Sequence, residues 1–282
     1  MLFRSELDRR AANDVYPSLT EMTRTALRAL ERATHKTEKG FFLMIEGSRI
    51  DHAGHINDPA AQVHEVLEYD NAFQAVLDFI EESRTETILV ATSDHETGGL
   101  ATAIQEPGHF PVYNWYPEVL ANASASCEKL AARLQDRMSN GPMSGPDEDL
   151  KAWINSNLVV AGLGVTDATD EELALLAKSP ESSIITFASI ISRRAHIGWS
   201  THGHTAVDVN IYSSGGPAAA QIRGNVENTD VGRFLSHYLD VDVDEITKEL
   251  REKTKRPGLE ALTAESVAAG WNSSVHHVAE RL

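Results

Sequence analysis

Two kinds of hydrophobic pattern alternate along the first part of the chain. Apolar residues recur every three or four positions over 15–36 and again over 58–82, which predicts two amphipathic helices. Two short runs, at 41–46 and 87–92, are apolar almost throughout. Such runs are typical of central parallel strands that are covered on both faces. The strand–helix–strand order predicts a right-handed parallel unit, in which both strands end at the same edge of the sheet.

Each predicted strand runs directly into polar residues that can carry chemistry. A buried strand fixes the backbone, and the loop at its C-terminal end presents side chains. We therefore expect a functional site at this edge of the sheet. Its candidate residues are Glu46, Asp51 and His55 after the first strand, and Asp94 and His95 after the second.

Residues 101–181 change character and are interpreted as a mainly helical insertion. Helices are predicted at about 125–138, 149–157 and 170–178, with a turn or linker at 140–146. Nothing in this stretch indicates catalysis. His109 and Cys127 are expected to be structural or surface residues rather than ligands.

The chain returns to α/β character after the insertion. The expected elements are a helix at 182–194, the motif His202-Gly203-His204, an alternating strand at 206–212 and a core helix at 228–239. We interpret residues 1–282 as one partial domain. In it, 40–100 and 182–240 form the α/β core, and 241–282 form a helical appendage.

Charge and composition narrow the possible partners. The chain has 282 residues with Lys+Arg 25 and Asp+Glu 42, a formal net charge of −17. This charge argues against a nucleic-acid-binding surface. A phosphate site remains possible, because bound metal cations reverse the local field. A single cysteine forms no internal disulfide, and no run approaches the ~20 apolar residues that span a bilayer. We expect a soluble chain as written, with its compartment unknown.

The carboxylate–histidine pattern predicts a metal site. Asp51 and His55 are four residues apart and Asp94 adjoins His95, a combination that suits zinc, while a carboxylate-rich neighbour suits magnesium. A lone His-x-His is more often a pair of loop histidines. Two strand ends that each carry a carboxylate and an imidazole favour a ligand cluster instead. Asp70, on the helix between them, is interpreted either as a stripe-edge carboxylate or as a group that orients a ligand.

The residues of both strand ends closely resemble the alkaline phosphatase family. The motifs are Glu46-Gly-Ser-Arg-Ile-Asp51-His-Ala-Gly-His55, Thr92-Ser-Asp94-His95-Glu-Thr-Gly-Gly, Gly203-His204-Thr205, Gly216-Pro217 and Glu227-Asn228-Thr229-Asp230. The resemblance covers 40–100 and 197–240 and is strongest to fungal and bacterial members. It implies an α/β three-layer fold with a mostly parallel central sheet, here incomplete because the N-terminal half is absent.

The resemblance also implies roles for individual residues. Asp51, His55 and His204 would hold a first zinc, Asp94 and His95 a second, and Glu46 a magnesium. The implied reaction is hydrolysis of phosphate monoesters to an alcohol and inorganic phosphate through a phosphoserine. Two zinc ions ~3.5–4 Å apart would clamp the attacking and leaving oxygens. Family resemblance further implies a possible homodimer.

The nucleophilic serine implied by the family is not found. It would lie N-terminal to Glu46 in an Asp-Ser-Ala context, and the residues before Glu46 contain no such motif. We therefore expect the C-terminal half of a phosphatase, with little activity in isolation. Two alternatives are a catalytically silent zinc-binding or interaction module and a related superfamily member, such as a phosphoglycerate mutase or a sulfatase.

Overall fold

A computed structural model describes residues 5–37, 40–105, 108–140 and 147–254. The chain divides into two compact units, Met1–Gly215 and Gly216–Leu282. All candidate site residues lie in the first unit. No described helix is both long enough and apolar enough to cross a membrane.

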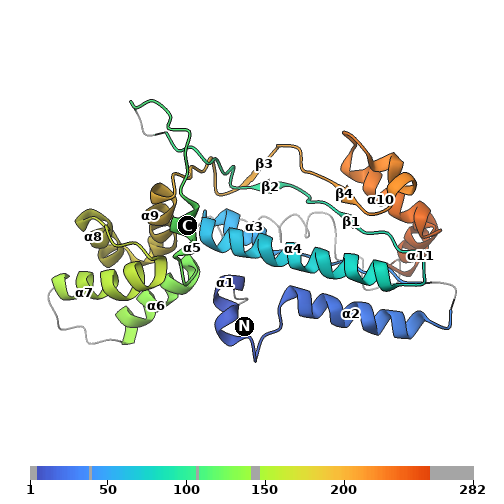
Figure 1. Cartoon of the computed structure of the whole chain (residues 1–282), viewed down its shortest axis with the longest axis horizontal. Helices are drawn as coiled ribbons and strands as arrows, with labels where there is room; N and C mark the ends of the chain where they lie inside the picture. The colour runs from blue at the N-terminus through green and yellow to red at the C-terminus, as the bar shows by residue number, and fades with distance from the viewer. Residues whose placement is uncertain (1–4, 38–39, 106–107, 141–146, 255–282) are drawn as a thin grey trace. The chain divides into compact units, whose positions relative to one another are not determined.

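The backbone of the first unit is built around one long helix, α4 (Pro59–Glu82). Its N-terminus is fixed by Asp58, whose Oδ1 accepts from the Ala61 N–H at 2.9 Å, and by proline in the first turn. Helix α2 (Leu19–Thr34) packs along it (Figure 1). Both helices predicted for this region are confirmed. Helix α2 begins later than expected because Ser18 caps it, accepting from the Glu21 N–H at 3.2 Å.

The main hydrophobic core lies in the helical region after residue 116. It is formed by α5 (Pro117–Ala121), α6 (Cys127–Asn140), α7 (Asp147–Ile154), a π-helical stretch (Asn155–Leu163), α8 (Asp170–Lys178), a 3₁₀ turn (Pro180–Ser182) and α9 (Ser183–Arg194). Its fully buried side chains include Leu130, Leu134, Leu158, Leu176, Phe187 and Ile191. The predicted insertion at 101–181 therefore supplies much of this buried core, together with α9. Helix α9 is the last helix of this core, and the chain continues from it into the segment that carries His204.

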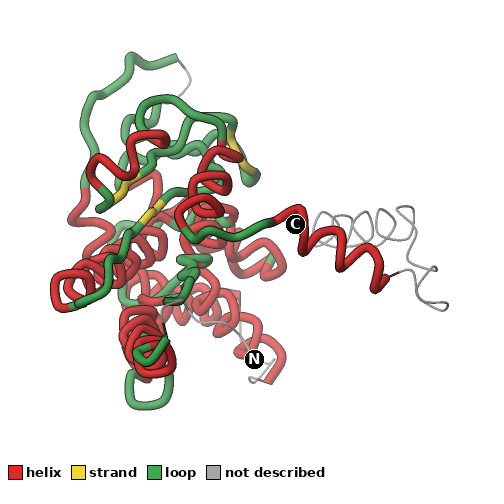
Figure 2. The backbone as a smooth tube through the Cα atoms, turned by 90° about the vertical axis from the view of Figure 1, so that its right-hand side faces the viewer, coloured by secondary structure: helices red, strands yellow, loops and turns green. Residues whose placement is uncertain are grey.

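The mostly parallel sheet predicted from the sequence is not found among the described residues. The strands are short: β1 (Val90–Ala91) pairs with β4 (Tyr212–Ser213), and β2 (Glu96–Thr97) pairs with β3 (His204–Thr205). Both described pairs are antiparallel. Figure 2 shows strands only as short yellow stretches among helices and loops. The 204–213 segment runs back along 90–97, because the chain re-enters from the helical core at the Gly98 end.

The first predicted strand is also covered on only one face. Within the described part of the chain, no backbone hydrogen bond links 41–46 to another segment. Phe41 packs toward α4, its ring centroid 6.2 Å from that of Phe79. Phe42 and Met44, which point the other way, are 52% and 78% exposed. The expectation of a strand buried on both faces is therefore wrong for this segment, because every second side chain is exposed.

The second unit contains a 3₁₀ stretch (Gly216–Ile222) and helices α10 (Asn228–Tyr238) and α11 (Val243–Thr254). Helix α10 confirms that a helix forms at the predicted position 228–239, but it lies in the second unit rather than in one core with 182–215. Its N-terminus is fixed by Glu227, whose N–H donates to Asp230 Oδ2 at 3.2 Å. Helix α11 lies in the helical appendage predicted at 241–282. The remainder of that appendage, 255–282, lies outside the described residues, as does most of the linker predicted at 140–146.

One buried carboxylate joins two helix ends in the first unit. Asp58 is 1% exposed, and its Oδ2 accepts from the Cys127 N–H at 2.7 Å while its Oδ1 caps α4. Burial raises the pKa of Asp58 and, together with the neighbouring Asp58 carboxylate, raises that of the Cys127 thiol. Asp8 binds beside it, accepting from the Ser126 N–H at 3.0 Å. These carboxylates tie α1 (Glu6–Arg9), α4 and α6 together.

Replacing Asp58 with alanine is expected to lower the free energy of unfolding by about 2–4 kcal/mol, because two buried backbone N–H groups lose their acceptor. Asp58→Asn keeps one acceptor oxygen and should lose less. Urea unfolding followed by circular dichroism measures both. Asp70→Ala, an exposed position on the same helix, is the matched control. If Asp70→Ala lowered the free energy of unfolding as much as Asp58→Ala does, the stabilising role assigned to the Asp58 hydrogen bonds would be contradicted.

Candidate metal centre

Helix α3 (Arg49–His55) supplies the first two candidate ligands. Residues four apart on a helix lie on one face, and here they meet: His55 Nε2 lies 3.3 Å from Asp51 Oδ1. The helix comes close to β2 because Gly54 has no side chain. A Cβ there would meet the Thr97 carbonyl oxygen at 2.9 Å. Thr97 in turn donates to Asp51 Oδ1 at 2.6 Å.

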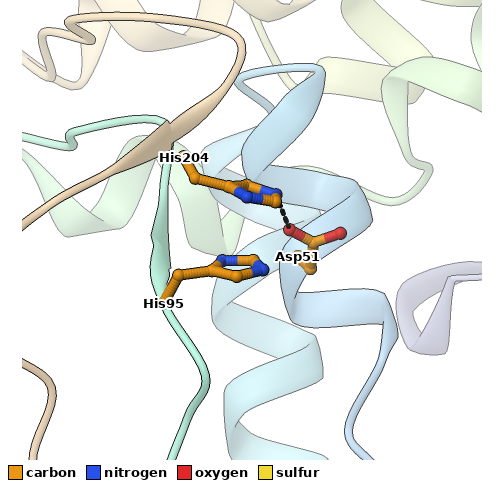
Figure 3. Close-up of side chains that lie close together, drawn as sticks. All are labelled: Asp51, His95 and His204. Carbon is orange, nitrogen blue, oxygen red and sulfur yellow. Dashed lines mark ion pairs between the residues drawn. The ribbon is translucent and has the colours of Figure 1, made fainter. Parts of the chain in front are cut away.

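The antiparallel pairing of β2 with β3 brings in the third candidate. Thr97 lies opposite His204 in this register. The His204 Nε2 atom lies 3.5 Å from Asp51 Oδ1 and 3.2 Å from His55 Nε2. His95 stacks on the His204 ring, with centroids 3.3 Å apart. Figure 3 shows Asp51, His95 and His204 converging from α3, the 95–97 segment and β3.

The spacing of these donor atoms has a direct chemical meaning. Asp51 Oδ1, His55 Nε2 and His204 Nε2 form a triangle with edges of 3.2, 3.3 and 3.5 Å. A tetrahedral zinc ion with bonds of ~2.0–2.1 Å separates neighbouring ligand atoms by roughly 3.3–3.4 Å. Donor atoms of Asp51, His95 and His204 also all lie within 4.8 Å of one another. These donor atoms are therefore close enough together to bind one metal cation.

Hydrogen bonds fix which nitrogens are available as ligands. His55 Nδ1 lies 2.6 Å from the His202 carbonyl oxygen. A carbonyl only accepts, so Nδ1 carries the proton, and in the neutral imidazole Nε2 then has the lone pair. Thr97 gives its proton to Asp51, so His95 Nδ1, 3.2 Å from the Thr97 hydroxyl, is the donor in that contact. The lone pairs of both imidazoles then lie on Nε2.

Two glycines hold the turn that follows β2 against the 198–205 segment. Gly98 and Gly99 have φ values of +97° and +60°, a region that side chains disfavour. The Gly98 N–H donates to the Gly203 carbonyl at 2.9 Å. Glu96 accepts from the Gly99 N–H at 3.0 Å and receives the Thr205 hydroxyl. This turn therefore fixes His204 relative to His95.

The remaining predicted residues lie at the edge of this cluster or apart from it. Asp94 is 79% exposed at its side chain and contacts His95, with Oδ2 3.3 Å from Nε2. Glu46 is exposed, and no described hydrogen bond or ion pair joins it to the other candidates. Asp70 likewise has no such contact with them in the described part of the chain. Cys127 is buried at the α6 N-terminus and His109 is exposed, away from the ligands.

Two residues that contact the candidate ligands were not predicted to do so from the sequence: Thr97, which binds Asp51, and His202, which binds His55. Thr97 lies two residues after His95, so the two-residue period of an extended chain places both side chains on one face. That spacing was a usable signal. The sequence pattern presents His202 only as a possible partner of His204 in a His-x-His pair. Its contact with His55 joins residues 147 apart in sequence, which no local pattern reveals.

Comparison with known proteins agrees with the motifs. A family model described as alkaline phosphatase matches residues 3–241. The chain is 43% identical over 274 residues to the repressible alkaline phosphatase of Saccharomyces cerevisiae, covering 93% of this chain and 48% of that protein. It is 36% identical to alkaline phosphatase 3 of Bacillus subtilis over 80% of this chain and 45% of that protein.

Solved structures give the same result. A cold-active alkaline phosphatase from Shewanella sp. superposes with a TM-score of 0.61 at 33% identity, covering 78% of this chain and 50% of that one. Thermus thermophilus alkaline phosphatase gives 0.66 at 26% identity, covering 85% and 51%. The chain thus spans about half the length of these relatives. It belongs to the alkaline phosphatase family.

Proposed function

We propose that this chain furnishes the zinc-binding part of a phosphatase that hydrolyses phosphate monoesters. The observation that carries the proposal is the triangle of Asp51 Oδ1, His55 Nε2 and His204 Nε2, with edges of 3.2–3.5 Å. Membership of the alkaline phosphatase family supports the same reaction class. Three protein ligands with one open position are characteristic of catalytic rather than structural zinc.

The donor set favours zinc over magnesium or calcium at this position. Two imidazole nitrogens and one carboxylate oxygen suit a borderline-soft ion, whereas magnesium and calcium prefer oxygen ligands throughout. A zinc ion held there would supply Lewis-acid polarisation of a phosphoryl oxygen. The side chains of Asp51 and His204 are 34% and 47% exposed, which leaves room for a substrate phosphate beside them. The cation would also offset the chain's negative charge locally.

The protein groups around the triangle hold its geometry. Thr97, which is buried, donates to Asp51 and so fixes one oxygen toward the imidazoles. The His202 carbonyl keeps the His55 lone pair on Nε2. These groups act by positioning donors in advance, and each is a hydrogen-bond partner of a proposed ligand.

Asp94 and His95 are proposed to bind a second zinc. The support is the 3.3 Å separation of Asp94 Oδ2 from His95 Nε2, two atoms that both present lone pairs. His95 also stacks against His204, so a second ion would lie near the first group of ligands. The assignment of Glu46 to a magnesium ion rests on the motif alone, because no described contact joins Glu46 to the cluster.

We further propose that the phosphoryl-accepting serine is not supplied by this chain. Among the described residues, no serine hydroxyl contacts a side chain of the proposed ligands. Ser93, the nearest in sequence, donates instead to the His95 carbonyl at 2.8 Å. The same observation favours a second candidate function, a zinc-binding module without turnover. A homodimer, expected from the family, remains a prediction.

His204→Ala is expected to weaken zinc binding more than His202→Ala, because the His204 ring nitrogen lies 3.5 Å from Asp51 Oδ1, whereas the His202 ring binds the His55 carbonyl. Competition with a chromophoric chelator measures both affinities. The zinc affinity of His204→Ala should be at least about tenfold lower than that of His202→Ala. Equal effects would refute the choice of His204 as the ligand.

Asp51→Asn is expected to lower the bound zinc by about one ion per chain, because the amide replaces the only anionic donor of the triangle. Elemental analysis of dialysed protein gives the stoichiometry. Asp70→Asn, exposed on α4, is the matched control and should bind as the unmodified chain does. Unchanged stoichiometry in Asp51→Asn would remove Asp51 from the site.

The purified chain, supplied with zinc and magnesium, is expected to bind metal but to hydrolyse a chromogenic phosphate ester only marginally. The reason is the missing nucleophile. Turnover is followed by release of the coloured alcohol, with chelator-treated protein as the control. Robust turnover that disappears with the chelator would show that this chain contains its own nucleophile and would exclude the silent-module alternative.

A further inference from the structure

Two reciprocal hydrogen bonds join the end of α3 to the loop that precedes β3. His55 Nδ1 lies 2.6 Å from the His202 carbonyl oxygen, and His202 Nδ1 lies 2.8 Å from the His55 carbonyl oxygen. In each residue the ring nitrogen Nδ1 is hydrogen-bonded to the main-chain carbonyl of the other. The two residues lie 147 positions apart in sequence. Together they form a closed clasp between the helix and the loop.

The clasp fixes the protonation of both rings. A carbonyl oxygen accepts and never donates, so each Nδ1 must carry its hydrogen. The His55 carbonyl is also one of the C-terminal carbonyls that a helix leaves without an intrahelical partner. No other donor reaches it among the described residues. The His202 ring thus caps α3, in the manner of a basic side chain near a helix C-terminus.

We propose that His202 is a positioning residue of the metal site, which holds His55 in the tautomer whose Nε2 is free to bind a cation. The hydrogen bond from the His202 ring to the His55 carbonyl holds the His202 main chain in place. The His202 carbonyl therefore stays within hydrogen-bond distance of His55 Nδ1. The loop then delivers His204 two residues later. This inference rests on the proposed zinc-binding function.

His202 does not itself have the geometry of a ligand. Its Nδ1 is engaged with the His55 carbonyl, and the ring is exposed. It has no described contact with Asp51 or His204. The competing interpretation, in which His202 and His204 bind one ion as a His-x-His pair, makes a different chemical prediction. A ligand must be replaced by a group that reaches the metal, whereas a clasp needs only a donor at the position of Nδ1.

The tautomer of His55 tests the proposal without any metal. In the metal-free chain, long-range proton–nitrogen correlation spectra should show His55 protonated on Nδ1, with its signals assigned by their loss in His55→Asn. In His202→Ala, the His55 population should shift toward the Nε2-protonated form. His35→Ala is the matched control, because His35 Nδ1 contacts the Arg32 carbonyl at 2.6 Å at the far end of α2. An unchanged His55 tautomer in His202→Ala would overturn the proposal.

Zinc affinity provides the second measurement. His202→Ala should weaken binding by about 10–100-fold, the usual effect of losing a residue that orients a ligand. The amide nitrogen of His202→Asn occupies the place of Nδ1 and should restore most of the affinity. His202→Gln, whose amide reaches the place of Nε2, should not. Rescue by Gln rather than Asn would identify His202 as a ligand and refute its positioning role.

The Asn and Gln variants keep the test decisive even where His202→Ala fails to fold. The two readouts also separate this inference from the proposed function. A chain that binds no zinc but shows the His55 tautomer shift would refute the zinc site and retain the clasp. A chain that binds zinc with unchanged affinity in His202→Ala would retain the site and refute the clasp.

Discussion

The candidate metal centre depends on one pairing, that of Thr97 in β2 with His204 in β3. This register places the His204 ring over His95 and brings its Nε2 to Asp51. A shift by one residue would turn His204 to the opposite face, because side chains alternate along a strand. The Gly98–Gly99 turn and the Glu96 carboxylate hold the register by binding Gly203, Gly99 and Thr205.

The site is assembled from segments with very different anchoring. Helix α3 packs against Thr97 and against α4. The segment with His204 instead connects α9 of the helical core to β4 and contains only the short strand β3. Contacts between residues some 150 positions apart are costly to form in the unfolded chain, because loop closure must come first. Hydrogen bonds such as that between the His55 ring and the His202 carbonyl, 147 positions apart, therefore matter more for the precision of the site than for the bulk of the stability.

The sequence predicted the helices better than it predicted the sheet. The 3.6-residue period located α2 and α4, whereas the sequence predicts a loop where helix α3 carries Asp51 and His55. The parallel sheet could not be predicted correctly, because an apolar run such as 41–46 does not reveal whether another element covers its second face. Here Phe42 and Met44 are exposed. The role of His202 was equally hidden, since it depends on a contact with a distant main-chain carbonyl.

The carboxylate of Asp58 has a consequence for how the first unit opens. Helix ends ordinarily fray one at a time, each at a small free-energy cost. In this chain the first turns of α4 and α6 share one acceptor group, through Ala61 and Cys127. Opening either turn exposes a buried carboxylate that still binds the other, so the two ends are released as a single cooperative unit. Amide hydrogens at both helix starts would then exchange with solvent through the same local unfolding event.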